Sequence, residues 1–128
     1  MYNNELPRGI GDEGEDSAAA FLRSNGYTMI ARNYTSRFGE IDIIAQKNTY
    51  IIFVEVKTRK ANSLVGGIEA VSISKQRKII KTAMMFMANE KINLQPRFDI
   101  IEVVTQRGFD PKINHLENAF DSEGFYGF

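Results

Sequence analysis

The chain has 128 residues, a formal net charge of zero and no cysteine. This length suits one domain with a single core, spanning residues 1–128, and the lack of cysteine excludes disulfide scaffolds, thiolate catalysis and cysteine-ligated zinc. The sequence contains no signal-peptide pattern and no apolar run of about 18 residues, so we expect a soluble cytoplasmic protein that does not enter a membrane.

The N-terminal part of the chain predicts an arm, a helix and a strand. Residues 1–11 are polar, contain Pro7 and two glycines, and are expected to form a flexible arm. A helix is expected from Asp12 to Asn25, because acids stand at its start, apolar residues recur within it, and Gly26 follows as a stop signal. A first strand is expected at about 27–33.

Two further strands, at about 40–46 and 50–58, are expected to form a hairpin. Either Lys47-Asn48 or Asn48-Thr49 forms the two-residue turn, and both choices place Asp42 on the same face as Glu55. The second choice sets Asp42 opposite Glu55 and Glu40 opposite Lys57. Charges inside such apolar runs are disfavoured unless they are paired or bind a metal, so the hairpin is a candidate site.

Facing carboxylates repel each other, and a hard divalent cation is the usual reason for tolerating them. Mg²⁺ would suit Asp42, Glu55 and a backbone carbonyl, because it keeps several waters and needs few protein ligands. Lys57 would point into the same space, as a proton acceptor or as a cation beside a phosphate. The alternative is a solvated strand face with an ordinary pair of Glu55 and Lys57, and the residues alone leave both interpretations open.

The second half of the chain predicts a loop, a long helix and a last strand. Residues Ala61 to Gly67 are expected to form an exposed, mobile loop. Ser74 is the expected N-cap of a helix that runs to about Glu90. Pro96 then precedes a strand over Phe98 to Thr105. The alternation of strands and helices predicts an α/β fold.

Basic residues are concentrated between Lys57 and Lys81, where seven of them accompany one acid, Glu69. On the long helix, one arc is apolar and belongs to the core: Ile79, Ile80, Ala83, Met84 and Met87. The other side is basic, which is either a solvated face or a surface that contacts phosphates. The candidate phosphate-binding residues are Arg59, Lys60, Lys75, Arg77, Lys78 and Lys81. Zero net charge counts against a nucleic-acid enzyme, and this local concentration offsets it.

Several motifs resemble known proteins. An acid in one strand followed by Glu55-Val56-Lys57 in the next resembles the PD-(D/E)XK nuclease core, with Ile41 in place of the proline. More specifically, the chain resembles the bacterial YraN-like family, largely uncharacterised and related to archaeal Holliday-junction resolvases. The motifs that carry this likeness span nearly the whole chain: Gly14-Glu15, Gly26-Tyr27, Arg32-Asn33, Gly39-Glu40-Ile41-Asp42, Phe53 to Arg59, Arg97-Phe98-Asp99, His115-Leu116 and Asn118-Ala119-Phe120.

The resemblance implies a restriction-endonuclease-like core with a mixed central sheet flanked by helices. It implies metal-dependent hydrolysis of DNA, including branched or junction DNA, with Mg²⁺ or Mn²⁺ held by Asp42, Glu55, the Val56 carbonyl and Glu15, and with Lys57 as the catalytic cation. From the residues alone, Glu15 is equally a helix N-terminal acid that complements the helix dipole. A homodimer is a further implication.

Two other functional interpretations stay open. One is a nuclease-like fold that binds nucleic acid or a protein without cutting, and the other is an interaction domain in which Asp42 and Glu55 are exposed and point apart. Glu40 is left as either a flanking acid or an ion-pair partner. Asp99 is expected to form a structural pair near Arg97, and His115 to have a packing or hydrogen-bonding role. The aromatic C-terminal residues are expected to cap the core or to form a dimer contact: Phe120, Phe125, Tyr126 and Phe128.

Overall fold

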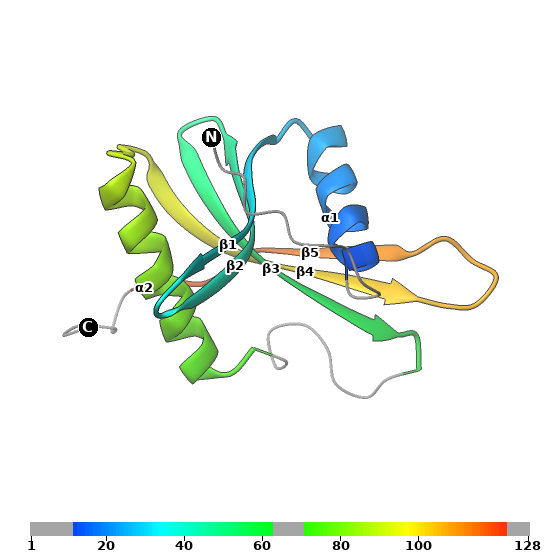
Figure 1. Cartoon of the computed structure of the whole chain (residues 1–128). Helices are drawn as coiled ribbons and strands as arrows, with labels where there is room; N and C mark the ends of the chain where they lie inside the picture. The colour runs from blue at the N-terminus through cyan, green and yellow to red at the C-terminus, as the bar shows by residue number, and fades with distance from the viewer. Residues whose placement is uncertain (1–11, 63–70, 123–128) are drawn as a thin grey trace.

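The computed structural model describes residues 12–62 and 71–122, and these form a mixed α/β fold. In chain order, the elements are α1 (Asp12–Ser24), β1 (Thr28–Ser36), β2 (Gly39–Lys47), β3 (Tyr50–Lys60), α2 (Ile73–Asn89), β4 (Gln95–Thr105) and β5 (Lys112–Phe120) (Figure 1). The expected arm at residues 1–11 and residues 63–67 of the expected loop lie outside the described residues, whereas Ala61 and Asn62 form an exposed turn.

The five strands form one mixed sheet in the order β1-β2-β3-β4-β5. Neighbouring strands are antiparallel except for β3 and β4, which are parallel from the pair Tyr50–Gln95 to the pair Lys60–Thr105. Parallel neighbours need a crossover connection, and the segment that contains α2 supplies it. The sheet is therefore mixed, as the resemblance implied, and α2 lies in the connection between β3 and β4.

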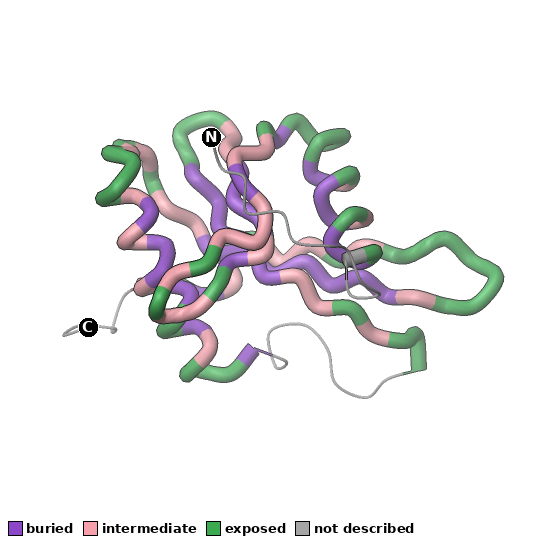
Figure 2. The backbone as a smooth tube through the Cα atoms, in the orientation of Figure 1, coloured by how far each residue is buried: buried purple, intermediate pink, exposed green. Residues whose placement is uncertain are grey.

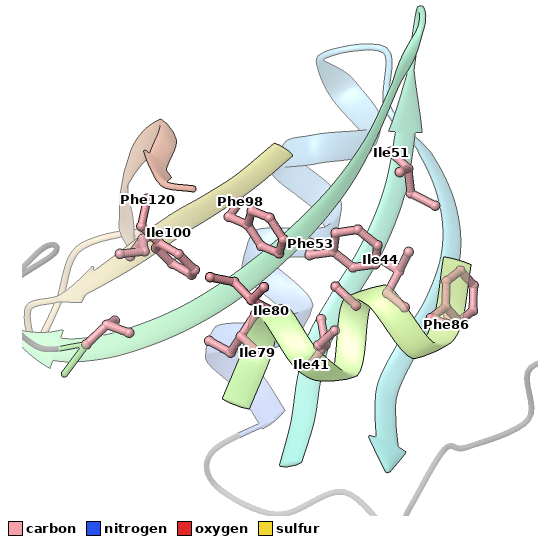
Figure 3. Close-up of a cluster of buried hydrophobic side chains, with 13 residues drawn as sticks. Ile41, Ile44, Ile51, Phe53, Ile79, Ile80, Phe86, Phe98, Ile100 and Phe120 are labelled. Carbon is pink, nitrogen blue, oxygen red and sulfur yellow. The ribbon is translucent and has the colours of Figure 1, made fainter. Parts of the chain in front are cut away.

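Each face of the sheet has its own apolar core, in place of the single core that the chain length suggested, because strand side chains alternate between faces. Phe53 of β3 lies with Ile80 and Phe86 of α2 on one face (Figure 3). Ile52 and Val54, its neighbours in the same strand, pack with residues of α1 on the other face. Buried residues accordingly line the middle of the sheet and the inner side of both helices (Figure 2). Glu55, Lys57 and Arg59 follow Phe53 and Val54 along β3, at the edge of these two cores.

Helix α1 begins and ends close to the predicted limits. Ala18, Ala19 and Leu22 are fully buried. Gly26 adopts a positive φ of 86°, and the Tyr27 N–H donates to the Leu22 carbonyl at 3.0 Å, so Gly26 ends the helix as predicted. A conformation with positive φ costs a glycine little, which explains its use here.

Helix α2 starts slightly earlier than predicted. Ser72, not Ser74, is the N-cap, and its hydroxyl accepts a hydrogen bond from the Lys75 N–H at 3.1 Å. Both serines precede a helical pattern, and the serine whose hydroxyl reaches an unpaired N–H of the first turn becomes the cap. The predicted apolar arc does face the sheet, since Ile79, Ile80 and Ala83 are buried.

The sequence did not predict β5. Its residues are mostly polar and half-exposed, and it lies at the edge of the sheet, where such residues are tolerated. At its end, Phe120 is buried and stacks on Phe98 with 5.3 Å between the ring centroids, so this aromatic residue caps the core. Phe125, Tyr126 and Phe128 lie outside the described residues.

Neither described helix is both long enough and apolar enough to cross a membrane.

Candidate functional site

The candidate site lies where β2 and β3 separate. The turn between them is centred on Asn48 and Thr49, one of the two predicted choices, and the pairing runs from Lys47–Tyr50 to Ile43–Val54. It ends there, because β2 continues alongside β1 and β3 continues alongside β4 (Figure 1). Asp42 and Glu55 are the first residues beyond this last pair. Their side chains interact, but the two residues are not backbone partners. The predicted direct pairings of Asp42 with Glu55 and of Glu40 with Lys57 are therefore wrong, because the two strands separate before these positions.

Beyond the last backbone pair, the side chain of Asp42 makes the hydrogen bond to β3 that a backbone carbonyl of β2 would otherwise make. Its Oδ2 accepts a hydrogen bond from the Val56 N–H at 2.8 Å. A backbone N–H that has lost its strand partner must be satisfied in another way, and a carboxylate is a strong acceptor. This bond orients the Asp42 carboxyl group toward Glu55 and Val56, so three of the four residues that the resemblance implied as metal ligands lie together.

Asp42 and Glu55 interact electrostatically. Burial, followed by the charge of nearby Glu55, raises the pKa of Asp42 to about 8, against the opposing effect of the Val56 N–H. The charge of Glu15 and a side-chain hydrogen bond with Glu55 also raise the pKa of Asp42. Glu55 is only 4% exposed. The two carboxyl groups are therefore close and largely withdrawn from water, unlike the exposed, divergent pair that an interaction domain predicts.

Two lysines from different elements approach Glu55. Lys57 Nζ lies 3.4 Å from Glu55 Oε2, and Lys75 Nζ of α2 lies 3.9 Å from the same oxygen. Lys57 was predicted at this place, since it follows Glu55 by two residues on one strand. Lys75 was predicted only as a phosphate-binding residue, because nothing in the sequence indicates how α2 is oriented on the sheet.

Glu15 is brought to the site by α1 and held by an arginine that sequence reasoning did not assign to the site. Arg32 Nε lies 3.1 Å from Glu15 Oε1, and Arg32 Nη2 lies 2.8 Å from Asp16 Oδ1. Burial lowers the pKa of Arg32, but hydrogen bonds to Asp16 and Glu15 outweigh it and leave the pKa raised. The only sequence signal for Arg32 was its place in one of the family-like motifs.

Close packing at Gly14 sets the position of α1. A Cβ atom built on Gly14 would overlap Thr58 Oγ1, so only glycine allows the helix start to approach β3 this closely. Glu15 is the next residue along the helix. A substitution at Gly14 would therefore move the carboxylate that acts on Asp42.

The donor atoms fit a hard divalent cation. Among residues 12–62 and 71–122, no group of three or more His, Cys, Asp or Glu side chains is arranged to hold a metal ion. Mg²⁺, however, is commonly bound through one or two carboxylates with waters in its other positions. Asp42, Glu55 and the Val56 carbonyl make up such a set. A cation would also relieve the repulsion that contributes to the raised pKa of Asp42, whereas Glu15 is already engaged with Arg32.

The six predicted phosphate-binding residues divide into separate environments. Arg59 of β3 forms an ion pair with buried Glu102 of the neighbouring strand β4, at 2.9 Å between Nε and Oε2. Lys60 is exposed at the end of β3, and Arg77 and Lys78 are exposed on α2. Lys75 approaches Glu55, and Lys81 lies over the ring of Phe38, 5.5 Å from its centroid. The four cations of α2 are thus distributed from the acidic pair to the β1–β2 turn.

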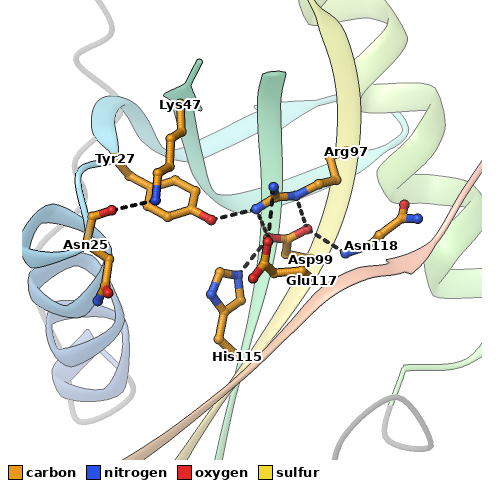
Figure 4. Close-up of polar contacts among 8 residues, drawn as sticks. All are labelled: Asn25, Tyr27, Lys47, Arg97, Asp99, His115, Glu117 and Asn118. Carbon is orange, nitrogen blue, oxygen red and sulfur yellow. Dashed lines mark hydrogen bonds and ion pairs between the residues drawn. The ribbon is translucent and has the colours of Figure 1, made fainter. Parts of the chain in front are cut away.

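Asp99 belongs to a separate buried network (Figure 4). Arg97 donates to both of its oxygens, at 2.9 and 2.7 Å, and His115 Nε2 lies 2.7 Å from Asp99 Oδ2. The Asn118 N–H donates to Asp99 Oδ1 at 2.9 Å. Burial would raise the pKa of Asp99, but its hydrogen bonds with these three residues outweigh burial and lower the pKa. Arg97 also donates to the Tyr27 hydroxyl, so the network ties β4 and β5 to the end of α1. The expected structural roles of Asp99 and His115 match these contacts.

Comparisons with known proteins indicate a family without an assigned activity. The chain matches the uncharacterised protein family UPF0102 over residues 14–103. It is 42% identical over 117 residues to a UPF0102 protein of Syntrophotalea carbinolica, covering 91% of this chain and 94% of that protein. Similar proteins occur in Persephonella marina, at 45% identity over 112 residues (87% and 92% covered), and in Caldanaerobacter subterraneus subsp. tengcongensis, at 42% over 114 residues (87% and 93% covered).

Proposed function

We propose that this chain, which belongs to the uncharacterised protein family UPF0102, is a metal-dependent endonuclease that hydrolyses phosphodiester bonds in DNA, with branched or junction DNA as the expected substrate. The observation that carries the proposal is the Asp42–Glu55 carboxyl pair beside Lys57. Burying two carboxyl groups this close together lowers stability, and such pairs are concentrated at functional sites. We further propose that the sheet and its two helices correspond to a restriction-endonuclease-like core.

In the proposed mechanism, Asp42, Glu55 and the Val56 carbonyl would hold Mg²⁺ or Mn²⁺. A bound ion would supply Lewis acidity and would lower the pKa of a coordinated water. The Lys57 ammonium is placed to orient the attacking water or to neutralise the charge that develops on the phosphate. Lys75, near the same carboxylate, contacts a neighbouring phosphate, and Glu15 contributes its charge from the position that Arg32 sets.

The basic residues of α2 support the proposal that the substrate is an anion. Helix α2 contains four cations and no acid: Lys75, Arg77, Lys78 and Lys81. Contacts between such residues and phosphates position a nucleic acid without reading its sequence. Lys75 extends this surface directly to Glu55, so a strand bound along α2 would lead into the acidic pair.

Incubation of the purified protein with linear, nicked, flapped and four-way DNA tests the proposal, with Mg²⁺, Mn²⁺ or a chelator in parallel. We expect cleavage only with a metal, and a loss of at least about 100-fold in Asp42→Asn and in Lys57→Ala, because each removes a group needed at the reacting phosphate. Lys112→Ala, at an exposed lysine at the start of β5, is the matched control and should cut at the parental rate. Parental cleavage by either site variant would contradict the assigned roles.

A binding module without cleavage is the second candidate. The ion pair between Glu15 and Arg32 favours it, since that acid is then satisfied without a metal. A titration with Mn²⁺ separates the two candidates. A metal site predicts a saturable rise in melting temperature, equivalent to about 2.7 kcal/mol at 100 times the Kd, that is lost in Asp42→Asn. A binding module predicts no saturable change in either protein.

A further inference from the structure

A shallow apolar depression lies beside the β1–β2 turn, apart from the acidic pair. Phe38, Lys81, Met84, Met85 and Ala88 line it, and its volume is about 420 Å³. This size falls within the range of about 300–1,000 Å³ that is common for small-ligand sites. Phe38, the aromatic ring in this lining, is half-buried. The depression thus offers an aromatic face and two flexible methionines to a flat ligand.

The turn that carries Phe38 is held firmly against α2. Ser36 Oγ lies 2.9 Å from Thr82 Oγ1 of the helix, and the Phe38 N–H donates to Ser36 Oγ at 3.0 Å. A Cβ atom on Gly39 would lie 3.3 Å from the Lys78 Cβ, so glycine permits the close approach of the turn to the helix. The position of the ring relative to α2 is therefore set before a ligand binds, which reduces the cost of binding.

Cations surround the ring. The Arg37 guanidinium carbon lies 5.0 Å from the ring centroid of Phe38, and Lys81 Nζ lies 5.5 Å from it. Glu40 is exposed two residues beyond Phe38, and α2 carries no acid at all. The partner that complements this surface combines negative charge with flat aromatic groups. Nucleic acid has both, whereas an apolar peptide lacks the charge and a second copy of this chain has a net charge of zero.

A row of lysines connects the depression with the acidic pair. Lys75, Lys78 and Lys81 are spaced three residues apart on α2, so they follow one side of the helix at intervals of about 4.5 Å. The row starts at Glu55 and ends at Phe38. Phe38 precedes β2 directly, and the four residue steps from it to Asp42 span about 13 Å along the extended chain. A strand bound along the lysines would therefore place one base at Phe38 while its phosphates approach Asp42.

We infer that Phe38 is a stacking platform for an unpaired base of single-stranded nucleic acid, with Lys75, Lys78 and Lys81 contacting the phosphates of the same strand. The guanidinium of exposed Arg37 moves away from the ring when the base binds, and it then contacts the adjoining phosphate. Aromatic rings bind bases in this way with little sequence preference. The inference rests on the proposed function for the class of ligand, which is nucleic acid. A stacking platform at Phe38 would favour substrates that have an unpaired segment beside the cut.

Fluorescence of Phe38→Trp tests the inference, because the chain contains no tryptophan and the new side chain is the only indole. The protein, in a chelator, is titrated with a twelve-nucleotide oligothymidylate or with an abasic strand of the same length, and the bound fraction is measured separately by anisotropy of an end label. We expect both strands to bind and only the strand with bases to quench the fluorescence of this indole. Tyr50→Trp, at an exposed aromatic position with Arg97 over its ring, is the control and should show no such difference.

Affinities of ring-deleted variants complete the test. Phe38→Ala, and Phe38→Leu as the variant that keeps apolar volume, should weaken binding of the oligothymidylate by roughly 5- to 100-fold and of the abasic strand by less than about twofold. Equal quenching by both strands, equal weakening of both, or no binding of either would overturn the inference. The chelator separates this result from cleavage: stacking without cleavage refutes the proposed function alone, and cleavage without stacking refutes this inference alone.

Discussion

Asp42 illustrates how the pKa of one residue is set by groups on two strands and a helix. In isolation, an aspartate has a pKa of about 3.9. Here burial, Glu55 and Glu15 act together and raise the pKa to about 8, although the Val56 N–H opposes them. Near neutral pH, without a metal, the Asp42 carboxyl group is therefore expected to keep its proton, beside the hydrogen bond with Glu55.

The raised pKa of Asp42 predicts that stability falls as pH rises. Below about pH 4, Asp42 is protonated in both the folded and the unfolded chain. Between about 4 and 8, only the folded chain keeps the proton, so the free energy of unfolding decreases through this window. In chelator, Asp42→Asn should remove this decrease and be more stable than the parent at pH 9, by on the order of 2 kcal/mol, since partial exposure of the carboxyl group reduces the full effect.

Urea unfolding at pH values from about 5 to 9 measures this effect. Asp110→Asn, at an exposed aspartate, is the control and should follow the parent. A parental pH dependence in Asp42→Asn would show that another group causes the decrease.

Asp99 predicts the opposite dependence on pH. Burial opposes its ionisation, but the hydrogen bonds with His115, Arg97 and Asn118 outweigh burial and lower its pKa. Its contribution to stability is therefore present above about pH 4 and is lost as pH falls through the lowered pKa.

Asp99→Asn should cost about 3–5 kcal/mol near neutral pH, since Arg97 would keep a largely buried charge without its buried carboxylate partner. Glu117→Gln removes an exposed partner of the same arginine and should cost less than about 1 kcal/mol in urea unfolding. Equal costs would contradict the assigned importance of Asp99.

At the scale of elements, the site depends on how closely α1 approaches β3. Gly14→Ala would force a Cβ atom onto Thr58 Oγ1 and should destabilise the protein by about 1–3 kcal/mol. Thr58→Ala removes the clashing oxygen, so the double variant should recover most of this loss. A double-mutant cycle in urea measures the coupling between the two positions. Additive losses would mean that the clash is relieved elsewhere.

At the scale of the whole molecule, zero net charge conceals an uneven distribution. Because α2 carries four cations and no acid, the proposed binding of nucleic acid is expected to weaken as the salt concentration rises. Lys78→Ala should lower the slope of log K against log salt concentration by about one, because one phosphate contact is lost. Anisotropy titrations in chelator between about 50 and 200 mM salt measure the slope. Lys112→Ala, on β5, should keep the parental slope, and an unchanged slope in Lys78→Ala would remove this lysine from the interface.

Local patterns in the sequence determined the elements that depend on short-range chemistry. Gly26 ends α1, the Ile-rich runs form β2 and β3, and the turn at Asn48 and Thr49 was one of two stated choices. The charges of Asp42, Glu55 and Lys57 stood out because apolar strands seldom carry them. In each case a few neighbouring residues contain the whole signal.

Which of these groups come into contact depends on the packing of strands and helices that are distant in the sequence. The separation of β2 from β3 after Ile43 and Val54 brings Asp42 to the Val56 N–H, and the packing of the helices brings Arg32 to Glu15 and Lys75 to Glu55. The edge strand β5 was missed for a related reason, since its polar residues pair with β4 without a strong preference of their own. Such contacts join residues far apart in the chain, and their geometry follows from the burial of both cores together rather than from any local pattern.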